Sequence, residues 1–197
     1  MVATGRTFTD QDWYGEDLRA AKFSECTFSR VDLSEATSSG AQFANCVFDN
    51  CRFNSSVHTS SAFVACEFRR CNFFDATFEG CKLAGSTFAE CTLRPVKVRG
   101  GQWRSVSLRG ANLSKLDLSG LDLREADLSM SDLSETVLRG AQLDGAVLRQ
   151  ARLHGADLVG ASLDRVDLAA AELRDTRLDL PGAVLLAEQH GVIVELA

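Results

Sequence analysis

The sequence predicts an all-β fold in which the chain winds as a square coil around a filled axis. Three observations predict it. A large apolar residue occupies every fifth position from Phe8 to Leu178, and only Ser38 and His58 interrupt this central column. A second column, two residues earlier in each pentad, holds mostly small residues such as Ala and Cys. No residue is inserted or lost over this range, so both columns keep one register.

The period of five defines the shape of the coil. It fits neither an α-helix, whose apolar stripe recurs about every 3.6 residues, nor a strand, whose faces alternate every two. A backbone that turns a corner every five residues places each central residue on the axis. Four sides then bring residue n + 20 next to residue n, at a ladder spacing of about 4.8 Å. Phe28, Phe48, Phe68 and Phe88 should therefore stack along one face.

The pentads carry a recurring motif of Ala, then Asp or Asn, then Leu. It occurs as Ala111-Asn112-Leu113, Ala126-Asp127-Leu128 and Ala156-Asp157-Leu158, and it resembles the pentapeptide-repeat family. The resemblance covers residues 6 to 180 and implies the fold of that family, a right-handed quadrilateral β-helix. We expect a β-helix over residues 1–180, followed by a short C-terminal helix and strand over residues 181–197 that cap the rod and dimerise.

All cysteines fall in the small column. They are Cys26, Cys46, Cys51, Cys66, Cys71, Cys81 and Cys91. We interpret them as reduced, buried hydrophobes, because an odd number with one structural role argues against a disulfide framework. No close pair such as CxxC indicates a metal site, and nothing predicts a cofactor. Reduced thiols, no N-terminal signal peptide and no apolar run of ~20 residues predict a cytoplasmic protein that does not span a membrane.

The two interruptions of the central column are themselves twenty residues apart. Ser38 and His58 should therefore be neighbours on one face of successive coils. The segment 54–61 around His58 is rich in turn-forming residues. We expect a locally bulged side with His58 turned to solvent. The alternative is a projecting loop in which Ser38 and His58 contact a partner.

Residues 94–115 form a basic collar. Its cations are Arg94, Lys97, Arg99, Arg104, Arg109 and Lys115, and no acidic residue lies among them. Its four arginines occupy the same pentad position, so they point to four different faces. We interpret the collar as solvated and predict no direct nucleic-acid binding, with binding through this collar as the alternative. Gly100-Gly101, shortly after Pro95, predicts a bulge or a tight corner.

The pentad pattern ends after residue 180. Asp179 as a cap, Pro181 in the first turn and Gly191 as a stop predict a helix over residues 181–190. Residues 192–196 predict a short strand. The helix and strand share an apolar surface made of Leu185, Leu186, Val192, Ile193 and Val194. This surface either floors the last coil or is buried in a homodimer across a two-fold axis, and we favour the dimer.

This tail resembles the C-terminal module of the Qnr and MfpA proteins. The residues that carry the resemblance are Leu178-Asp179, Ala183, Leu185-Leu186, Glu188 and Gly191-Val192-Ile193-Val194. Those proteins are dimeric pentapeptide-repeat proteins that bind DNA gyrase, protect it from quinolones and are similar to B-form DNA in shape and charge. The resemblance implies a homodimer whose partner is DNA gyrase, a type II topoisomerase. This chain lacks the inserted loops typical of Qnr proteins and so is nearer to the loop-poor MfpA type.

Charge is distributed unevenly along the chain. Residues 1–116 hold 12 acidic and 14 basic residues, whereas residues 117–197 hold 15 and 7. Since duplex DNA carries one charge per about 1.7 Å, a dimer would match it within a factor of about two at its centre only. The candidate contacts directly precede a central leucine: Asp117, Asp122, Asp127, Asp132, Asp157 and Asp167. The repeat pattern itself favours Asp or Asn there, so repeat chemistry is the alternative source of most of the excess; the charge supports a DNA mimic without deciding it.

These observations favour a binding protein. A filled rod offers no concave site with converging polar groups, and no nucleophile has an evident base, so we predict that the protein is not an enzyme. We expect a DNA mimic that binds and modulates DNA gyrase, giving resistance to quinolones or to a gyrase-targeting toxin. The alternative is a structural or adaptor solenoid for an unrelated protein partner.

Overall fold

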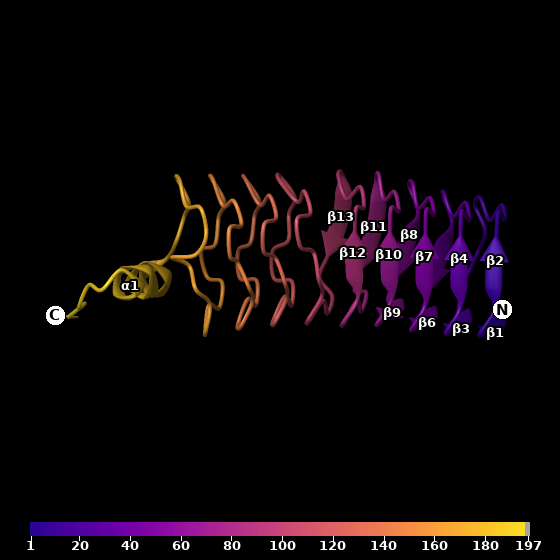
Figure 1. The fold of residues 1–197 in the computed structure, drawn as a ribbon, viewed down its shortest axis with the longest axis horizontal. Coiled ribbons are helices and arrows are strands. Elements are labelled where there is room, and N and C mark those ends of the chain that lie inside the picture. Colours follow the sequence, from indigo (N-terminus) through magenta and orange to yellow (C-terminus); the bar gives the residue numbers. More distant parts are fainter. Residues whose placement is uncertain (196–197) are drawn as a thin grey trace.

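The computed structural model, described over residues 1–195, is a rod of stacked coils with one helix at its C-terminal end (Figure 1). Parallel pairing joins residue n to residue n + 20, from Val2 and Lys22 at one end to Asp157 and Arg177 near the other. The parallel β-solenoid predicted from the sequence is therefore confirmed, together with its register.

Three of the four faces carry a parallel sheet. The β1 face holds β1 (Val2–Thr4), β3 (Lys22–Ser24), β6 (Gln42–Ala44) and β9 (Ala62–Val64). The β2 face holds β2 (Thr7–Thr9), β4 (Thr27–Ser29), β7 (Val47–Asp49), β10 (Glu67–Arg69) and β12 (Thr87–Ala89). The β5 face holds β5 (Thr37–Ser39), β8 (Val57–Thr59), β11 (Ala76–Glu79) and β13 (Val96–Arg99). The fourth, the Trp13 face, is joined by single bridges such as that between Asp12 and Asp32.

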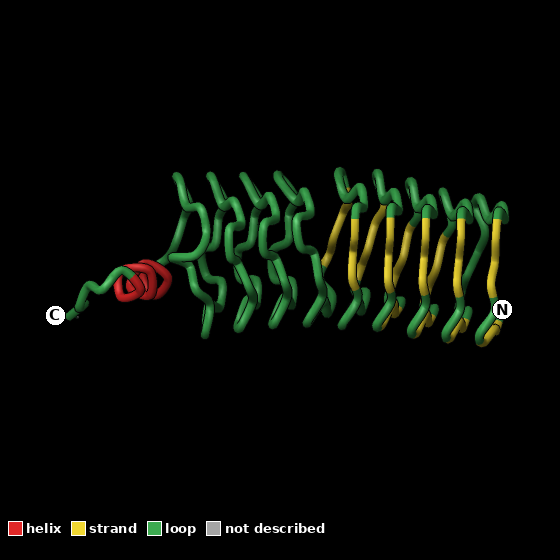
Figure 2. The backbone as a smooth tube through the Cα atoms, in the orientation of Figure 1, coloured by secondary structure: helices red, strands yellow, loops and turns green. Residues whose placement is uncertain are grey.

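The strands stop halfway along the rod. From residue 100 to residue 195 the coils are held by single bridges and tight turns (Figure 2). In this half, Asp or Asn often precedes the central leucine, and its side-chain oxygen accepts a hydrogen bond from the N–H two residues on, as that of Asp117 does from Ser119 (3.0 Å). Such Asx turns bend the chain directly after the bridging residue. The Thr and Val residues at the same position in the first half favour longer strands.

The central column fills the axis, and its phenylalanines stack as predicted. Ring centroids lie 4.6 Å apart for Phe28 and Phe48, 4.9 Å for Phe48 and Phe68, and 4.7 Å for Phe68 and Phe88. The ring planes of these pairs diverge by at most 15°. Parallel pairing at n and n + 20 dictates this stacking, because it places identical side chains one ladder spacing apart.

The small column packs at the inner corners. All seven thiols are free, six are buried, and Cys91 is half-buried. Each buried thiol lies against carbonyl oxygens; Cys46, for example, donates to Phe23 (3.6 Å) and Ala44 (3.4 Å). This agrees with the interpretation of the cysteines as small buried hydrophobes with a weak S–H donor.

The predicted exposure of His58 is wrong. The side chain is 1% exposed and points to the axis, and the segment around it forms β8 and its flanking turns without a projecting loop. Ser38 is also buried, and its hydroxyl lies 2.8 Å from His58 Nδ1. On the other side of the ring, Ser56 Oγ lies 3.0 Å from Nε2. The ladder from β5 through β8 to β11 continues without interruption, and it forces position 58 inward.

The tail forms helix α1 (Leu180–Gln189), close to the predicted bounds. Asp179 caps it by accepting a hydrogen bond from the Gly182 N–H (3.0 Å). The predicted strand is absent over residues 192–195, and Leu196 lies outside the described residues. A strand needs a neighbouring edge for its backbone groups, and within residues 1–195 none lies beside this segment.

Candidate protein-interaction surface

The predicted acidic residues surround the rod. Asp117, Asp122, Asp127 and Asp132 follow one another at intervals of five, so one projects from each face of a single coil. Asp157 lies on the same face as Asp117, with Val137 between them. Asp167 lies on the same face as Asp127, with Val147 between them in the twenty-residue register. Members of each pair are two ladder spacings apart, about 10 Å. The structure therefore forms two acidic pairs, on the β5 and β2 faces, and does not bring all six together.

Arginines hold three of these carboxylates. Asp122 is largely buried under Arg124, which donates to both carboxylate oxygens at 2.8 Å. Asp132 lies 3.1 Å from Arg152, and Asp157 lies 2.8 Å from Arg139. Bidentate Arg–carboxylate geometry such as that at Asp122 stabilises the local fold and leaves little charge for a partner.

The pKa directions follow from these contacts. The hydrogen bond from Arg124 is the main reason that the pKa of Asp122 lies below its usual range. Partial burial opposes ionisation of Asp132, but hydrogen bonds from Ser134 and the charge of Arg152 outweigh it and lower the pKa. All three arginine-held carboxylates therefore remain ionised at neutral pH, yet their charges are internally compensated.

The remaining three carboxylates have no ion-pair partner among residues 1–195. They are Asp117, Asp127 and Asp167. Asp117 and Asp167 are exposed, and Asp127 is half-buried. Their contacts are local: Asp127 accepts from the Ser129 N–H (3.0 Å), and Asp167 accepts from the Ala170 N–H (3.1 Å). These carboxylates therefore retain a negative charge that a basic partner could contact.

Two further acids on the β1 face belong with this group and escaped the sequence analysis. Asp144 and Asp164 follow their central leucines and lie in successive coils. Asp144 accepts from the Asp164 N–H (3.0 Å) and from Ser162 Oγ (2.7 Å). They stand outside the Ala-Asp-Leu motif, so the repeat pattern does not account for their charge. In the sequence, the interval of twenty residues between these two acids was the signal that they lie on one face in successive coils.

The basic collar is partly neutralised by acids of neighbouring coils. Arg104 pairs with Glu125 at 2.6 Å, and Lys115 lies 3.5 Å from Glu135. All four side chains are substantially exposed. This agrees with a solvated collar and gives no single cationic face.

Part of the C-terminal tail packs on the last coil, and part of it is exposed. Leu185 and Leu186 are half-buried against the core, so they floor the last coil. Gln189 extends this cap: its Oε1 accepts from the Leu168 N–H (2.9 Å), and its Nε2 donates to the Val166 carbonyl (2.7 Å). Ile193 remains 88% exposed. The helix therefore closes the rod and still leaves apolar side chains uncovered beyond it.

Other kinds of site find no support within residues 1–195. No three His, Cys, Asp or Glu side chains gather closely enough to hold a metal ion. Helix α1 is too short to cross a bilayer, and no other helix occurs in this range.

Comparison with known proteins bears on both the repeat and the fold. A sequence profile of the pentapeptide repeat region matches residues 21–97, 52–128 and 71–148, and a profile of eight pentapeptide repeats matches residues 141–179. No curated protein sequence matches the chain.

Solved structures of similar fold include QnrB1, a plasmid-mediated fluoroquinolone resistance protein. A trypsin-treated form of QnrB1 is 23% identical over 99% of this chain and 98% of that one, with a TM-score of 0.67. Full-length QnrB1 is 21% identical over 98% and 100%, also with a TM-score of 0.67. HetL, involved in heterocyst differentiation regulation in the cyanobacterium Nostoc, is 23% identical over 92% and 86%, with a TM-score of 0.45. Because the repeat profiles cover most of the residues whose coils keep the five-residue register, this chain belongs to the pentapeptide-repeat family.

Proposed function

We propose that the protein is a DNA mimic that binds a type II topoisomerase, DNA gyrase, and modulates it. Binding would give resistance to quinolones or to a gyrase-targeting toxin. The observation that carries the proposal is the position of the acidic half, residues 117–197, directly beside the apolar C-terminal end. Pairing two copies through that end would place two acidic halves together at the centre of a long rod. The end-to-end likeness in fold to QnrB1 supports the same function.

The proposed dimer is built on α1 and the segment after it. Val192 and Ile193 are exposed, and Val194 is half-buried, at the extreme end of the rod. Exposed apolar side chains grouped at a chain end favour burial against a second copy, and two-fold symmetry is the commonest arrangement. In this proposal residues 181–197 act as a capping and dimerisation module for the β-helix of residues 1–180.

The proposed contact surface consists of the acids without an ion pair in the coils next to that module, together with Asp164, which pairs with Arg165 at 3.1 Å. Asp117, Asp127 and Asp167, together with Asp144 and Asp164, would meet the Lys and Arg residues that hold DNA phosphates in the enzyme. The arginine-held Asp122, Asp132 and Asp157 would contribute shape more than charge. The protein acts without catalysis and without cofactor, in the cytoplasm, where gyrase works, and the basic collar binds no nucleic acid.

The experiment measures binding to purified gyrase and supercoiling activity, with and without the protein. Asp127 and Asp167 are replaced together by Asn. Asn72 and Asn112 make the same turn as Asp127, and Asn at position 167 keeps a side-chain oxygen that can accept from the Ala170 N–H, so the fold should be retained. We expect D127N/D167N to weaken gyrase binding about tenfold, since close charge pairs across an interface contribute more than rim charges.

The control replaces Asp12 and Asp17 at the other end of the rod, which make the same turn as Asp127; Asp17 is also paired with Arg19. D12N/D17N removes two equal charges and should bind gyrase like the unchanged protein. An equal loss in both variants would indicate a general charge effect and contradict the proposed surface. If the unchanged protein neither binds gyrase nor alters supercoiling, the adaptor solenoid with an unrelated partner is the better description.

A further inference from the structure

The ladder of backbone hydrogen bonds is broken on two adjacent faces after β13. In the surrounding coils, the N–H of a central residue donates to the carbonyl nineteen residues on, as Trp103 does to Asp122 (2.8 Å). Among residues 1–195, the N–H groups of Leu93 and Val98 find no such acceptor. The Asp117 N–H across the opening is also unpaired there, although its counterpart Asp127 donates back to Val106 (2.9 Å). The coils before and after this point separate in Figure 2. Unpaired backbone groups of this kind are an open strand edge.

Local residues explain the opening. Pro95 has no N–H to give to the next coil. At the following corner, Val96 and Leu116 stand one above the other in the small column, where most other corners stack a small residue on at least one side of any Val or Leu. Two branched side chains cannot fit the space between touching coils, so the coils part. One corner further on, Gly101 lies under Leu121 and leaves room for it, and the ladder closes again.

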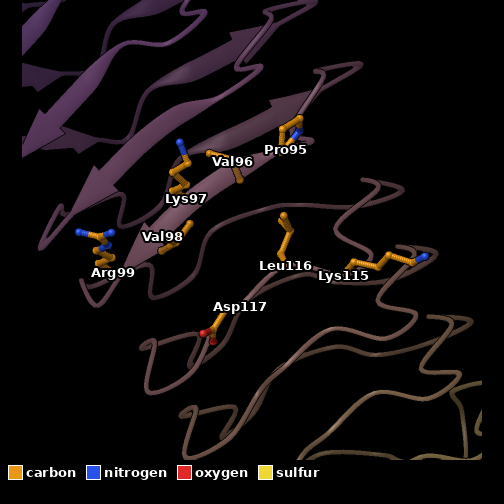
Figure 3. A pocket seen from close by; sticks show the side chains of 8 residues that line it. All are labelled: Pro95, Val96, Lys97, Val98, Arg99, Lys115, Leu116 and Asp117. Carbon is orange, nitrogen blue, oxygen red and sulfur yellow. The ribbon is translucent and has the colours of Figure 1, made fainter.

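The opening is a groove with an apolar floor. It has a volume of about 330 Å³ and lies between β13 and the segment around residue 116. Val96 and Val98 line it from β13, and Leu116 rises toward them from the next coil (Figure 3). Val98 also presents its unpaired N–H there. The groove thus offers both backbone groups and apolar contact to an added strand.

The rim of the groove is basic. Lys97, Arg99 and Lys115 line it, against a single acid, Asp117. Lys97 is paired with Asp75 at 2.6 Å, and Lys115 lies 3.5 Å from Glu135. Arg99 has no ion pair within residues 1–195, so its charge is available to a ligand.

We propose that this groove binds an extended, acidic segment of a partner protein as an additional strand on the open edge of β13. The partner's backbone would accept from the Val98 N–H and donate to the Val96 carbonyl. Its apolar side chains would alternate onto Val96, Val98 and Leu116, and its acidic side chains would meet Arg99. Duplex DNA would engage the cations alone and would leave the edge unpaired. The inference does not rest on the topoisomerase proposal; the two share Asp117, but the test below uses only this chain and a peptide.

The test uses the full chain and an acetylated peptide of alternating Val and Glu, followed by amide hydrogen exchange. In the free protein, the Val98 amide should exchange much faster than the paired amides of Trp103 and Leu118. Peptide at about ten times its Kd should slow exchange at Val98 and Asp117 about tenfold. The same peptide with Lys in place of Glu should not protect them.

Two variants separate the backbone contribution from the charge contribution. Val98→Pro removes an N–H that the fold does not use, and it should abolish protection of the Asp117 amide while Leu118 stays protected. Arg99→Gln should weaken peptide binding about two- to fivefold, as expected for a partly exposed charge pair. Arg19→Gln changes the same pentad position on the same face far from the groove and should have no effect.

Three results would overturn the proposal. The first is that the peptide fails to protect the Val98 amide in a protein whose Trp103 and Leu118 amides are protected. The second is that Val98→Pro binds the peptide as well as the unchanged protein does. The third is that a short DNA duplex protects the Val98 and Asp117 amides where the peptide does not.

Discussion

At the scale of single residues, His58 shows how the coil dictates an environment that the residue type does not suggest. Ser56 donates its only hydroxyl proton to the Phe53 carbonyl (2.8 Å), so Nε2 of His58 carries the ring proton and Nδ1 accepts from Ser38. The neutral ring is thereby satisfied. Complete burial lowers the pKa of His58 to about 3, because the charged form would lose its hydration.

This buried histidine predicts an acid-sensitive rod. The unfolded chain takes up a proton near pH 6.5, whereas the folded chain resists it until about pH 3. The contribution of neutral His58 to the free energy of unfolding is therefore fully present above pH 6.5 and falls by about 1.4 kcal/mol per pH unit below it. We expect His58→Gln to lose this part of the slope in urea unfolding measured across pH. His154→Gln, which removes a half-exposed histidine, serves as the control; the same slope in H58Q as in the unchanged protein would contradict the prediction.

The corners of the coil hold single residues in a left-handed backbone conformation. The residue two after each central residue commonly adopts a left-handed conformation, whether it is Gly, as at Gly110 (φ 68°), or not, as at Ala20 (φ 51°) and Arg70 (φ 53°). An isolated non-glycine residue would avoid this region at a cost of roughly 1–2 kcal/mol. The ladder hydrogen bonds that follow each corner stabilise it here, as that of the Ala20 N–H to Ser39 (2.9 Å).

Gly101 differs from these corners and predicts a local sensitivity. Its φ is 122°, and a Cβ there would lie 2.5 Å from the Cys81 carbonyl oxygen. Gly101→Ala should therefore lower the free energy of unfolding by about 2–4 kcal/mol. Gly100→Asn is the matched control, because Gly100 (φ 62°) has open space around it and Asn tolerates its conformation. Thermal unfolding of both variants measures the two effects, and an equal loss of stability in both would rule out the steric explanation.

At the scale of elements, α1 ends the solenoid by imitating a further coil. Asp179 accepts with one carboxylate oxygen from the Gly182 N–H inside the helix, and with the other from the Gly160 N–H of the last coil (2.9 Å). The Gln189 side-chain oxygen likewise accepts a hydrogen bond from the Leu168 N–H. Solenoids need such caps because the last coil otherwise exposes unpaired backbone and apolar surface.

The cap predicts a stability effect localised at the C-terminal end. Asp179→Ala removes a helix cap and a coil contact together, so we expect a loss of about 1–2 kcal/mol in helix stability. Amide exchange at Gly160 and Gly182 should accelerate, while that at Phe28 should not change. Glu172→Ala, which removes an exposed acid in the same coil region without a left-handed backbone, is the control. Unchanged exchange at Gly160 in D179A would show that the carboxylate does not hold the last coil.

At the scale of the whole molecule, the end of the rod predicts the oligomeric state. Ile193 is 88% exposed and contributes little to the fold of one chain. Ile193→Asp should convert the proposed dimer to a monomer in sedimentation without lowering the melting temperature of the coils. Val2→Asp places the same charge on an exposed residue at the opposite end and should leave the dimer intact. A monomeric unchanged protein would contradict the dimer directly.

The sequence alone determined the coil, its register and the apolar side chains on the axis, whereas the axial position of His58 came from the structure. An uninterrupted period of five has one physical meaning, because every insertion would rotate the following side chains out of the core. The same periodicity predicted the stack from Phe28 to Phe88 and the free thiols, and local capping chemistry predicted α1. The missing strand after Gly191 marks the limit of local pattern, since a strand forms only beside an edge that the chain must supply.

Tertiary structure alone decided which charges remain free and where the ladder opens. Asp122 and Asp127 share one motif, yet Arg124 covers the first and no arginine pairs with the second within residues 1–195. Val96 and Leu116 are unremarkable in sequence, and their conflict arises only because stacking places them at one corner. Local residues define the period, but contacts between residues twenty apart define the surface, and binding depends on that surface.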